Sequence, residues 1–198
     1  MTLTKLFFPA VAALALTVAG CSKPGEAPAT TAAAAVAPVA VSASSYDTVA
    51  NTGKGFTVGS MMSAQPVYVL FEPQCPHCGH LWQASLPLQG KVKFVWIPLA
   101  FNQGKSLAQA VTLMSSSTPL ETMTEHEKAL LSGNVGITAM GGITAEQEQA
   151  IKTNTQLLTT LGQDSVPFIL AKNRLTGEIV SHSGAMETAD LAKLIGVD

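Results

Sequence analysis

The chain has 198 residues, of which 47% are hydrophobic and 12% charged, which suits one ordinary globular domain with appendages. Its formal net charge is −2, Arg174 is the sole arginine, and no basic stretch occurs. Because nucleic-acid binding needs clustered Lys and Arg side chains, this composition argues against a nucleic-acid partner.

Residues 1–20 have the pattern of an export signal. Lys5 lies in a short start region, an apolar run extends over residues 6–16, and small residues follow at Ala19 and Gly20. The run is shorter than the roughly 20 apolar residues that a membrane-spanning helix needs. A signal peptide that is removed after export is therefore the favoured interpretation over a retained transmembrane anchor.

The next motif, Val18-Ala19-Gly20-Cys21, resembles a bacterial lipobox, in which the cysteine carries the lipid and begins the mature protein. The alternative is ordinary cleavage after a small residue, which leaves Cys21 as a free thiol. Lipidation is favoured because an odd exposed thiol is a liability in an oxidising compartment. We expect a protein that is lipid-anchored in the cell envelope and faces the periplasm. Ser22 favours the outer membrane if the organism is Gram-negative.

A low-complexity segment follows the lipobox. From Ser22 to about Ser45 it is dominated by Ala, Pro, Thr, Ser and Val, with little charge and no aromatic residue. Such a composition cannot bury enough apolar surface to fold. We therefore expect residues 21–50 to be the lipidated cysteine and a flexible tether, and residues 51–198 to be the folded domain.

The domain begins with a predicted strand, helix and strand. A strand-like stretch over residues 55–58 precedes a buried strand at Pro66–Phe71, which has β-branched and aromatic content. A helix is expected from Cys75 to about Ser85, stopped by Pro87, and a further strand over Lys91–Leu99. Strand, helix, strand in this order is a βαβ unit with parallel strands and a right-handed crossover.

A helical insertion is predicted at about residues 104–162. Lys105–Met114 carries apolar residues at three- and four-residue spacing, as an amphipathic helix does. The segments Thr118–Glu121 and Thr144–Gln147 both match a capping box and mark the starts of two more helices. Between them, the Gly-rich residues 133–142 are predicted to be a loop.

Two strands and a helix are predicted to end the chain. The strands are Pro167–Ala171 and Glu178–His182, joined by a hairpin around residues 173–177 and therefore antiparallel, and the helix is about Glu187–Ile195. The complete order is βαβ, a helical insertion, then ββα. This α/β order is that of the thioredoxin fold with an insertion.

The motif that carries chemistry is Cys75-Pro76-His77-Cys78. With Cys21 assigned to the lipid, these are the remaining cysteines, so no structural disulfide framework is possible beyond this pair. A helix start, with its free N–H groups and positive dipole end, can lower a thiol pKa from about 8.5 to about 3.5–7.5. His77 adds a donor or a positive charge. We expect Cys75 to attack the substrate and Cys78 to resolve the mixed disulfide.

Haem and zinc are rival interpretations of the two cysteines. A haem attachment site needs Cys-x-x-Cys-His, and Gly79 stands where that histidine is required. A zinc site needs two more ligands, for which His80 and either His126 or His182 are available, although no second closely spaced pair occurs. Redox use is favoured over both.

A copper carrier on the same fold is the other metal alternative. It would use the two cysteines with His182, or with Met61 and Met62. We expect redox chemistry without a metal or cofactor, and a copper or zinc carrier remains the alternative function.

The active-site segment carries a specific resemblance. Residues 67–78, Val-Tyr-Val-Leu-Phe-Glu-Pro-Gln-Cys-Pro-His-Cys, followed by Leu81 and Trp82, resemble the periplasmic disulfide oxidoreductases DsbG and DsbC of the thioredoxin superfamily. The Pro-His dipeptide is instead that of DsbA. The resemblance extends more loosely over about residues 55–197. It implies a thiol:disulfide oxidoreductase that forms or reduces disulfides in exported, cysteine-containing proteins and is recharged by a membrane redox partner.

The resemblance also implies roles for individual residues. Val166-Pro167 matches the family's cis-proline, which lies beside the active-site sulfurs and offers backbone hydrogen bonds to an extended substrate. Valine before this proline is again DsbA-like, whereas DsbC and DsbG carry threonine. Glu72 occupies the place of an aspartate in DsbC and DsbG, and it is either a local base or a solvated loop acid.

Two properties follow from comparing the motifs with the family pattern. DsbC and DsbG have an N-terminal dimerisation domain where this sequence has only tether, so a monomer is expected. The Pro-His dipeptide and Val166 favour an oxidant, recharged by a quinone-linked partner, whereas the DsbG-like surroundings favour a reductant. The direction of electron flow stays open at this point.

Overall fold

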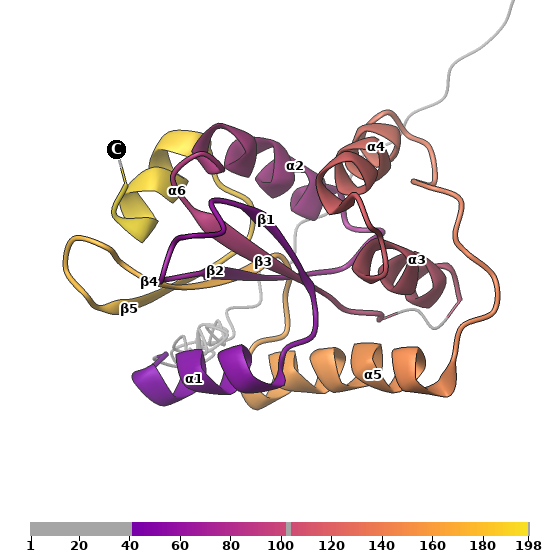
Figure 1. Cartoon of the computed structure of the whole chain (residues 1–198), viewed down its shortest axis with the longest axis horizontal. Helices are drawn as coiled ribbons and strands as arrows, with labels where there is room; N and C mark the ends of the chain where they lie inside the picture. The colour runs from indigo at the N-terminus through magenta and orange to yellow at the C-terminus, as the bar shows by residue number, and fades with distance from the viewer. Residues whose placement is uncertain (1–40, 102–103, 198) are drawn as a thin grey trace, which may run out of the picture. The chain divides into compact units, whose positions relative to one another are not determined.

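The structure is a computed structural model that describes residues 41–101 and 104–197. At its centre lies a five-stranded sheet in the order β1-β3-β2-β4-β5 (Figure 1). The strands are β1 (Phe56–Gly59), β2 (Val67–Phe71), β3 (Lys93–Pro98), β4 (Phe168–Lys172) and β5 (Ile179–Ser183). Strands β2 and β3 are parallel, and β1–β3, β2–β4 and β4–β5 are antiparallel. The predicted βαβ and ββα halves, and with them the thioredoxin fold, are confirmed.

Strand β2 contributes side chains to two apolar cores, one on each face of the sheet. All five of its residues are buried, and because successive side chains point to opposite faces of a sheet, they divide between two apolar clusters. Val67, Val69 and Phe71 join the cluster that includes Trp82 and Trp96. Tyr68 and Leu70 join the cluster on the other face. This double burial explains why the β2 sequence is continuously apolar and not alternating.

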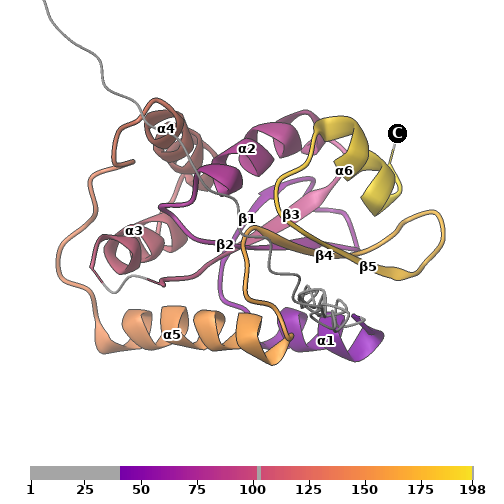
Figure 2. The ribbon, with the colours of Figure 1, turned by 180° about the vertical axis from the view of Figure 1, so that it is seen from behind.

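Helices cover both faces of the sheet. Helices α2 (Pro76–Ser85), α4 (Pro119–Leu131) and α6 (Thr188–Ile195) lie on one face, and α1 (Ala43–Thr52) and α5 (Ala145–Thr160) lie side by side on the other (Figures 1 and 2). Between the layers stands α3 (Lys105–Met114), which contacts β3, α4 and α5. A short 3-10 turn, Leu86–Leu88, ends the α2 segment. In the described part of the chain, no helix has the length and apolar character needed to cross a membrane.

Helix α1 corrects the predicted extent of the tether. The tether was expected to reach residue 50, but the chain is helical from Ala43, with Ser42 forming a capping box with Ser45. The Tyr46 hydroxyl donates to the Pro66 carbonyl at 2.8 Å, its ring stacks edge-on against Tyr68, and Val49 is fully buried. The prediction was wrong here because it averaged the composition of a low-complexity stretch. Such an average misses two apolar side chains, Tyr46 and Val49, that lie three residues apart. The export signal, Cys21 and the rest of the tether lie outside the described residues.

The helical insertion is built from α3, α4 and α5. The capping box at Thr144 is confirmed, since the Gln147 N–H donates to Thr144 Oγ1 and the Thr144 N–H to Gln147 Oε1. The box expected at Thr118 is wrong. Its hydroxyl makes no capping bond, and the Thr118 N–H donates instead to Ser116 Oγ. The helix still begins there, with Pro119 in its first position.

Buried Asn154 attaches α5 to the sheet. Its amide donates to the carbonyl oxygens of Lys54 at 2.7 Å and Pro98 at 2.9 Å, and its Oδ1 accepts from the Lys54 N–H at 2.9 Å. The side chain thereby satisfies backbone groups of Lys54, between α1 and β1, and of Pro98, at the end of β3.

Candidate active site

Cys75 begins helix α2, shortly after the carboxyl end of the central strand β2. It is the N-cap residue, in an extended conformation, and Pro76 follows in the first helical position. Proline is suited to that position because its missing N–H has no helical partner there and its φ angle is already helical. One turn later, Cys78 is fully buried, whereas Cys75 is partly exposed. Both cysteines are free thiols in this structure.

The two thiols differ strongly in acidity. The pKa of Cys75 is lowered to about 6, chiefly because the Cys78 thiol donates a hydrogen bond to its sulfur. Partial burial opposes this, while backbone N–H groups of Cys78 and His77 and the charge of His77 add to it. Burial raises the pKa of Cys78 well above its usual value, and the hydrogen bond to Cys75 adds to that rise. At neutral pH the pair is therefore one thiolate beside one thiol.

The loop before β4 lies against the exposed sulfur. The peptide bond between Val166 and Pro167 is cis, the conformation that the resemblance implies. The Cys75 thiol lies 3.8 Å from the Val166 carbonyl oxygen, within the range of a sulfur hydrogen bond. Pro167 is buried, and its carbonyl accepts from the Gly184 N–H at 2.8 Å, which fixes the loop to the segment after β5. Residues 91 positions apart in the sequence thus meet at the sulfur.

Glu72 is not a solvated loop acid. Only 8% of its surface is exposed, and its Oε1 accepts a hydrogen bond from the Gln74 N–H at 3.3 Å. The carboxylate therefore closes the turn that leads from β2 into Cys75. His77 and Pro76, in contrast, are exposed on the first turn of α2. The His77 ring lies 6.5 Å from that of His80, which is also exposed.

The insertion brings two more residues to the site, His126, which the sequence analysis considered only as a zinc ligand, and Glu127, which it did not consider. His126 is buried on α4, with Nε2 lying 2.7 Å from the Pro73 carbonyl oxygen and Nδ1 accepting from the Ile137 N–H at 3.2 Å. Since Nδ1 accepts, Nε2 carries the proton and donates. Burial lowers the pKa of His126, which keeps the ring neutral in these two bonds. Both nitrogens face backbone groups, so His126 does not serve as the zinc ligand considered above.

Glu127, the next residue, is buried against the start of α2. Only 1% of its surface is exposed, and neither carboxylate oxygen has a hydrogen-bond partner among the described residues. Burial raises the pKa of Glu127 to about 9, with further contributions from Cys75 and Glu72. The spacing of residues along α4 predicts that both His126 and Glu127 are buried. Positions 126 and 127 share a face with the buried apolar side chains Met123 and Leu130, so they point inward.

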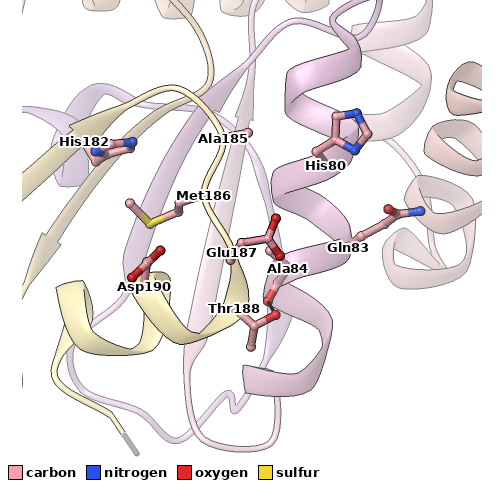
Figure 3. A pocket seen from close by; sticks show the side chains of 9 residues that line it. All are labelled: His80, Gln83, Ala84, His182, Ala185, Met186, Glu187, Thr188 and Asp190. Carbon is pink, nitrogen blue, oxygen red and sulfur yellow. Dashed lines mark hydrogen bonds between the residues drawn. The ribbon is translucent and has the colours of Figure 1, made fainter.

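Side chains proposed above as metal ligands are dispersed. No group of three or more His, Cys, Asp or Glu side chains that could hold a metal ion occurs within residues 41–101 and 104–197. His80 and His182 stand on opposite walls of a groove of about 840 Å³ between α2 and the β5–α6 segment (Figure 3). Met61 and Met62 are exposed, 63% and 94% respectively.

Two curated proteins are similar to this chain in sequence. The chain matches no known protein-family profile. It is 26% identical over 132 residues to the thiol:disulfide interchange protein DsbG of Pseudomonas aeruginosa, covering 66% of this chain and 50% of that protein. It is 28% identical over 105 residues to DsbG of Escherichia coli, covering 52% of this chain and 42% of that protein. The chain thus spans about half the length of these curated relatives.

The chain is similar to Dsb-type thiol:disulfide oxidoreductases of the thioredoxin superfamily. Solved structures support its fold. The chain is similar to a periplasmic thioredoxin-like protein from Salmonella enterica serovar Typhimurium, with a TM-score of 0.61 and 16% identity, over 79% of this chain and 96% of that one. It is also similar to the catalytic domain of Proteus mirabilis ScsC, with a TM-score of 0.58, 15% identity and coverage of 77% and 93%. It is similar as well to the thiol-disulfide exchange protein α-DsbA2 of Wolbachia pipientis, with a TM-score of 0.57 and 17% identity, over 77% of this chain and 92% of that one.

Proposed function

We propose that this protein is a thiol:disulfide oxidoreductase that acts on exported, cysteine-containing proteins through Cys75 and Cys78. The observation that carries the proposal is the difference between the two sulfurs. Cys75 is partly exposed with a pKa lowered to about 6, and Cys78 is buried with a raised pKa. Thiolates and not thiols are the nucleophiles of disulfide exchange, so the accessible sulfur is the reactive one.

The proposed reaction has two displacements. In the reducing direction, the Cys75 thiolate attacks one sulfur of a substrate disulfide, and the other substrate sulfur leaves as a thiolate. Cys78 then loses its proton and attacks the Cys75 sulfur, which forms the Cys75–Cys78 disulfide and releases the second substrate thiolate. The oxidising direction is the reverse of both steps. In each direction two electrons pass between substrate and protein.

The residues around the sulfurs have supporting roles in this proposal. Val166 and Pro167 hold a backbone carbonyl 3.8 Å from the Cys75 sulfur, where an extended substrate segment can align with the loop. Pro76 sets the first turn of α2, and the exposed His77 adds positive charge beside the thiolate. Glu72 acts as a positioning residue, since its carboxylate holds the turn before Cys75.

We further propose where the protein works. The sequence before the described domain supports export and lipidation at Cys21, which would tether the domain to the membrane on its periplasmic side. The name of the Salmonella neighbour includes a periplasmic location. Recharging by a membrane redox partner and a monomeric state complete the proposal, the latter because the segment before the described domain has a tether-like composition.

Substitution of each cysteine tests the proposed chemistry. Cys75→Ser is expected to lose all exchange activity in an insulin-reduction assay, and Cys78→Ser to accumulate mixed disulfides that non-reducing gels detect. Cys21→Ser is the matched control, which we expect to retain full activity because this cysteine lies in the predicted lipobox. Full activity of Cys75→Ser would overturn the proposal.

A further inference from the structure

Glu127 presents an unusual carboxyl group at the active site. It lies on α4 of the insertion and faces Gly79, the residue after Cys78. A Cβ atom at position 79 would lie 2.6 Å from Glu127 Oε2 and 3.1 Å from Leu131 Cγ. The absence of a side chain at Gly79 is what allows the carboxyl group to approach the first turn of α2.

This carboxyl group has no structural partner that explains its burial. It is 1% exposed, and within the described residues neither oxygen accepts or donates a hydrogen bond. Burying an unpaired carboxylate is costly, and such a group in a folded protein requires an explanation. The titratable groups that act on it electrostatically are Cys75, Cys78 and Glu72, which are all negative when ionised. A structural ion pair therefore does not account for it.

We propose that Glu127 is the proton donor and acceptor for Cys78 during disulfide exchange. This inference rests on the function proposed above and assigns a chemical role to the insertion. Cys78 is fully buried, so direct exchange of its proton with bulk water is slow, and fast transfer requires a nearby group. A general acid or base acts within hydrogen-bond reach or through one water molecule, and because neither Glu127 oxygen hydrogen-bonds to Cys78 in this structure, we infer the second route.

The proton follows the electron pair in each direction. When an incoming thiolate attacks Cys75 of the Cys75–Cys78 disulfide, the S–S bond breaks and Cys78 leaves with its electron pair. The Glu127 carboxyl group then gives its proton to that sulfur and becomes a carboxylate. In the reverse step the carboxylate takes the Cys78 proton, and the new thiolate attacks the Cys75 sulfur and expels the substrate thiolate.

The electrostatics of the site favour this timing. Burial raises the pKa of Glu127 to about 9, and the Cys75 thiolate is the next contribution. The acid is therefore protonated in the reduced protein. In a mixed disulfide Cys75 carries no charge, so its contribution disappears and Glu127 releases its proton to solvent more readily, which leaves the carboxylate that accepts the Cys78 proton. That is the state in which Cys78 must be deprotonated.

The test separates the two displacements in the full chain carrying Cys21→Ser. Reduced protein is mixed with glutathione disulfide, quenched in acid, and the Cys75–glutathione mixed disulfide is followed by mass spectrometry from pH 5 to pH 9. In Glu127→Gln we expect formation of the mixed disulfide within about twofold of the parent. We expect its resolution to slow by about 100-fold, the usual scale of general acid–base catalysis. The remaining rate should rise steadily with pH, because only hydroxide then removes the Cys78 proton.

Glu125→Gln is the matched control, since it makes the same chemical change at an exposed position of α4. It should resolve the mixed disulfide at the parent rate. Equal resolution rates and pH profiles in Glu127→Gln and Glu125→Gln would overturn the inference but leave the proposed function intact. A parent protein that forms no mixed disulfide would overturn both.

A spectroscopic measurement on the parent protein does not depend on the folding of a variant. We expect the reduced parent at pH 7 to show the infrared carbonyl band of a protonated carboxyl group, with the shift in D₂O that such a group gives. The absence of this band would show that Glu127 is ionised and has no proton to donate, and would overturn the inference.

Discussion

The Nε2 atom of His126 lies 2.7 Å from the carbonyl oxygen of Pro73. This bond connects α4 of the insertion to the turn that carries Cys75. The other ring nitrogen accepts from the Ile137 N–H, so the same side chain also holds the Gly-rich loop between α4 and α5. Gln109 on α3 donates to the carbonyls of Val135 and Ile137 in that loop at 2.7 and 2.8 Å. The insertion is therefore part of the framework of the active site.

Removal of the His126 ring is expected to destabilise the protein. His126→Ala leaves the Pro73 carbonyl and the Ile137 N–H without partners in a buried place, and each unsatisfied group costs about 1–3 kcal/mol. We expect a loss of about 2–5 kcal/mol in the free energy of unfolding, measured by urea denaturation. His80→Ala, at an exposed position of α2, should change it by less than about 0.5 kcal/mol. Equal stabilities of the two variants would contradict the role of His126.

Two glycines of the same loop offer a matched pair for the steric part of this contact. Gly136 and Gly133 have φ angles of +81° and +82°, which L side chains rarely adopt. A Cβ atom at Gly136 would overlap the His126 ring, whereas at Gly133 no atom lies within 4 Å. Gly136→Ala should therefore lower the free energy of unfolding by about 1–3 kcal/mol more than Gly133→Ala, the range for over-packing. Equal losses of unfolding free energy in the two variants would show that backbone strain alone, and not the contact with His126, causes both losses.

The sequence was sufficient to predict the helices and strands that carry strong local patterns. The buried strand β2, the helix start at Cys75 and the hairpin between β4 and β5 all follow from apolar runs, proline positions and turn residues. The Cys-x-x-Cys spacing likewise predicted the pair on which the proposed function rests. These features depend on residues close together in the chain, where propensity and periodicity are informative.

Contacts between distant segments were not accessible to the same reasoning. The solvated alternative for Glu72 was wrong because this side chain is buried in the turn before Cys75, which His126 of the insertion contacts at Pro73. Glu127 is one of three glutamates on α4, and local composition does not distinguish it from the exposed Glu121 and Glu125. The spacing of α4 indicates that Glu127 points inward, but only the packing of α4 on α2, across about 50 residues of chain, shows that its carboxyl group lies against Gly79.

The reactivity of Cys75 is expected to follow its lowered pKa. Because Cys75 has a pKa of about 6, its alkylation by iodoacetamide should reach half of its maximal rate near pH 6 and level off by pH 8. His77→Ala removes one charge that favours the thiolate, so the midpoint should move to higher pH. His80→Ala is the control on the same helix and should leave the midpoint unchanged. A midpoint near pH 8.5 in the parent would contradict the activated thiolate.

The direction of electron flow depends on the reduction potential of the pair. A stabilised thiolate favours the dithiol form and raises the potential. The Cys75 pKa of about 6 lies between about 7 for thioredoxin and about 3.5 for DsbA. We therefore expect a potential between about −270 mV and about −120 mV, measured by equilibration with glutathione. A value near that of thioredoxin would exclude the oxidant version of the proposed function.

The stability of the reduced protein should depend on pH through Glu127. Its pKa is raised from 4.5 to about 9, so the folded state binds the proton more tightly than the unfolded state. The resulting stabilisation is fully present below about pH 4.5 and is lost as the pH rises through about 9. The free energy of unfolding of the parent minus that of Glu127→Gln should therefore fall as the pH increases from 5 to 9. The slope should not exceed about 1.4 kcal/mol per pH unit. Cys75 and His126 also titrate, but both proteins contain them, so the difference retains only the part of their titration that is coupled to Glu127. Urea denaturation of both proteins at several pH values gives the slope, and a difference that is flat or rises with pH would show that Glu127 is ionised in the folded protein.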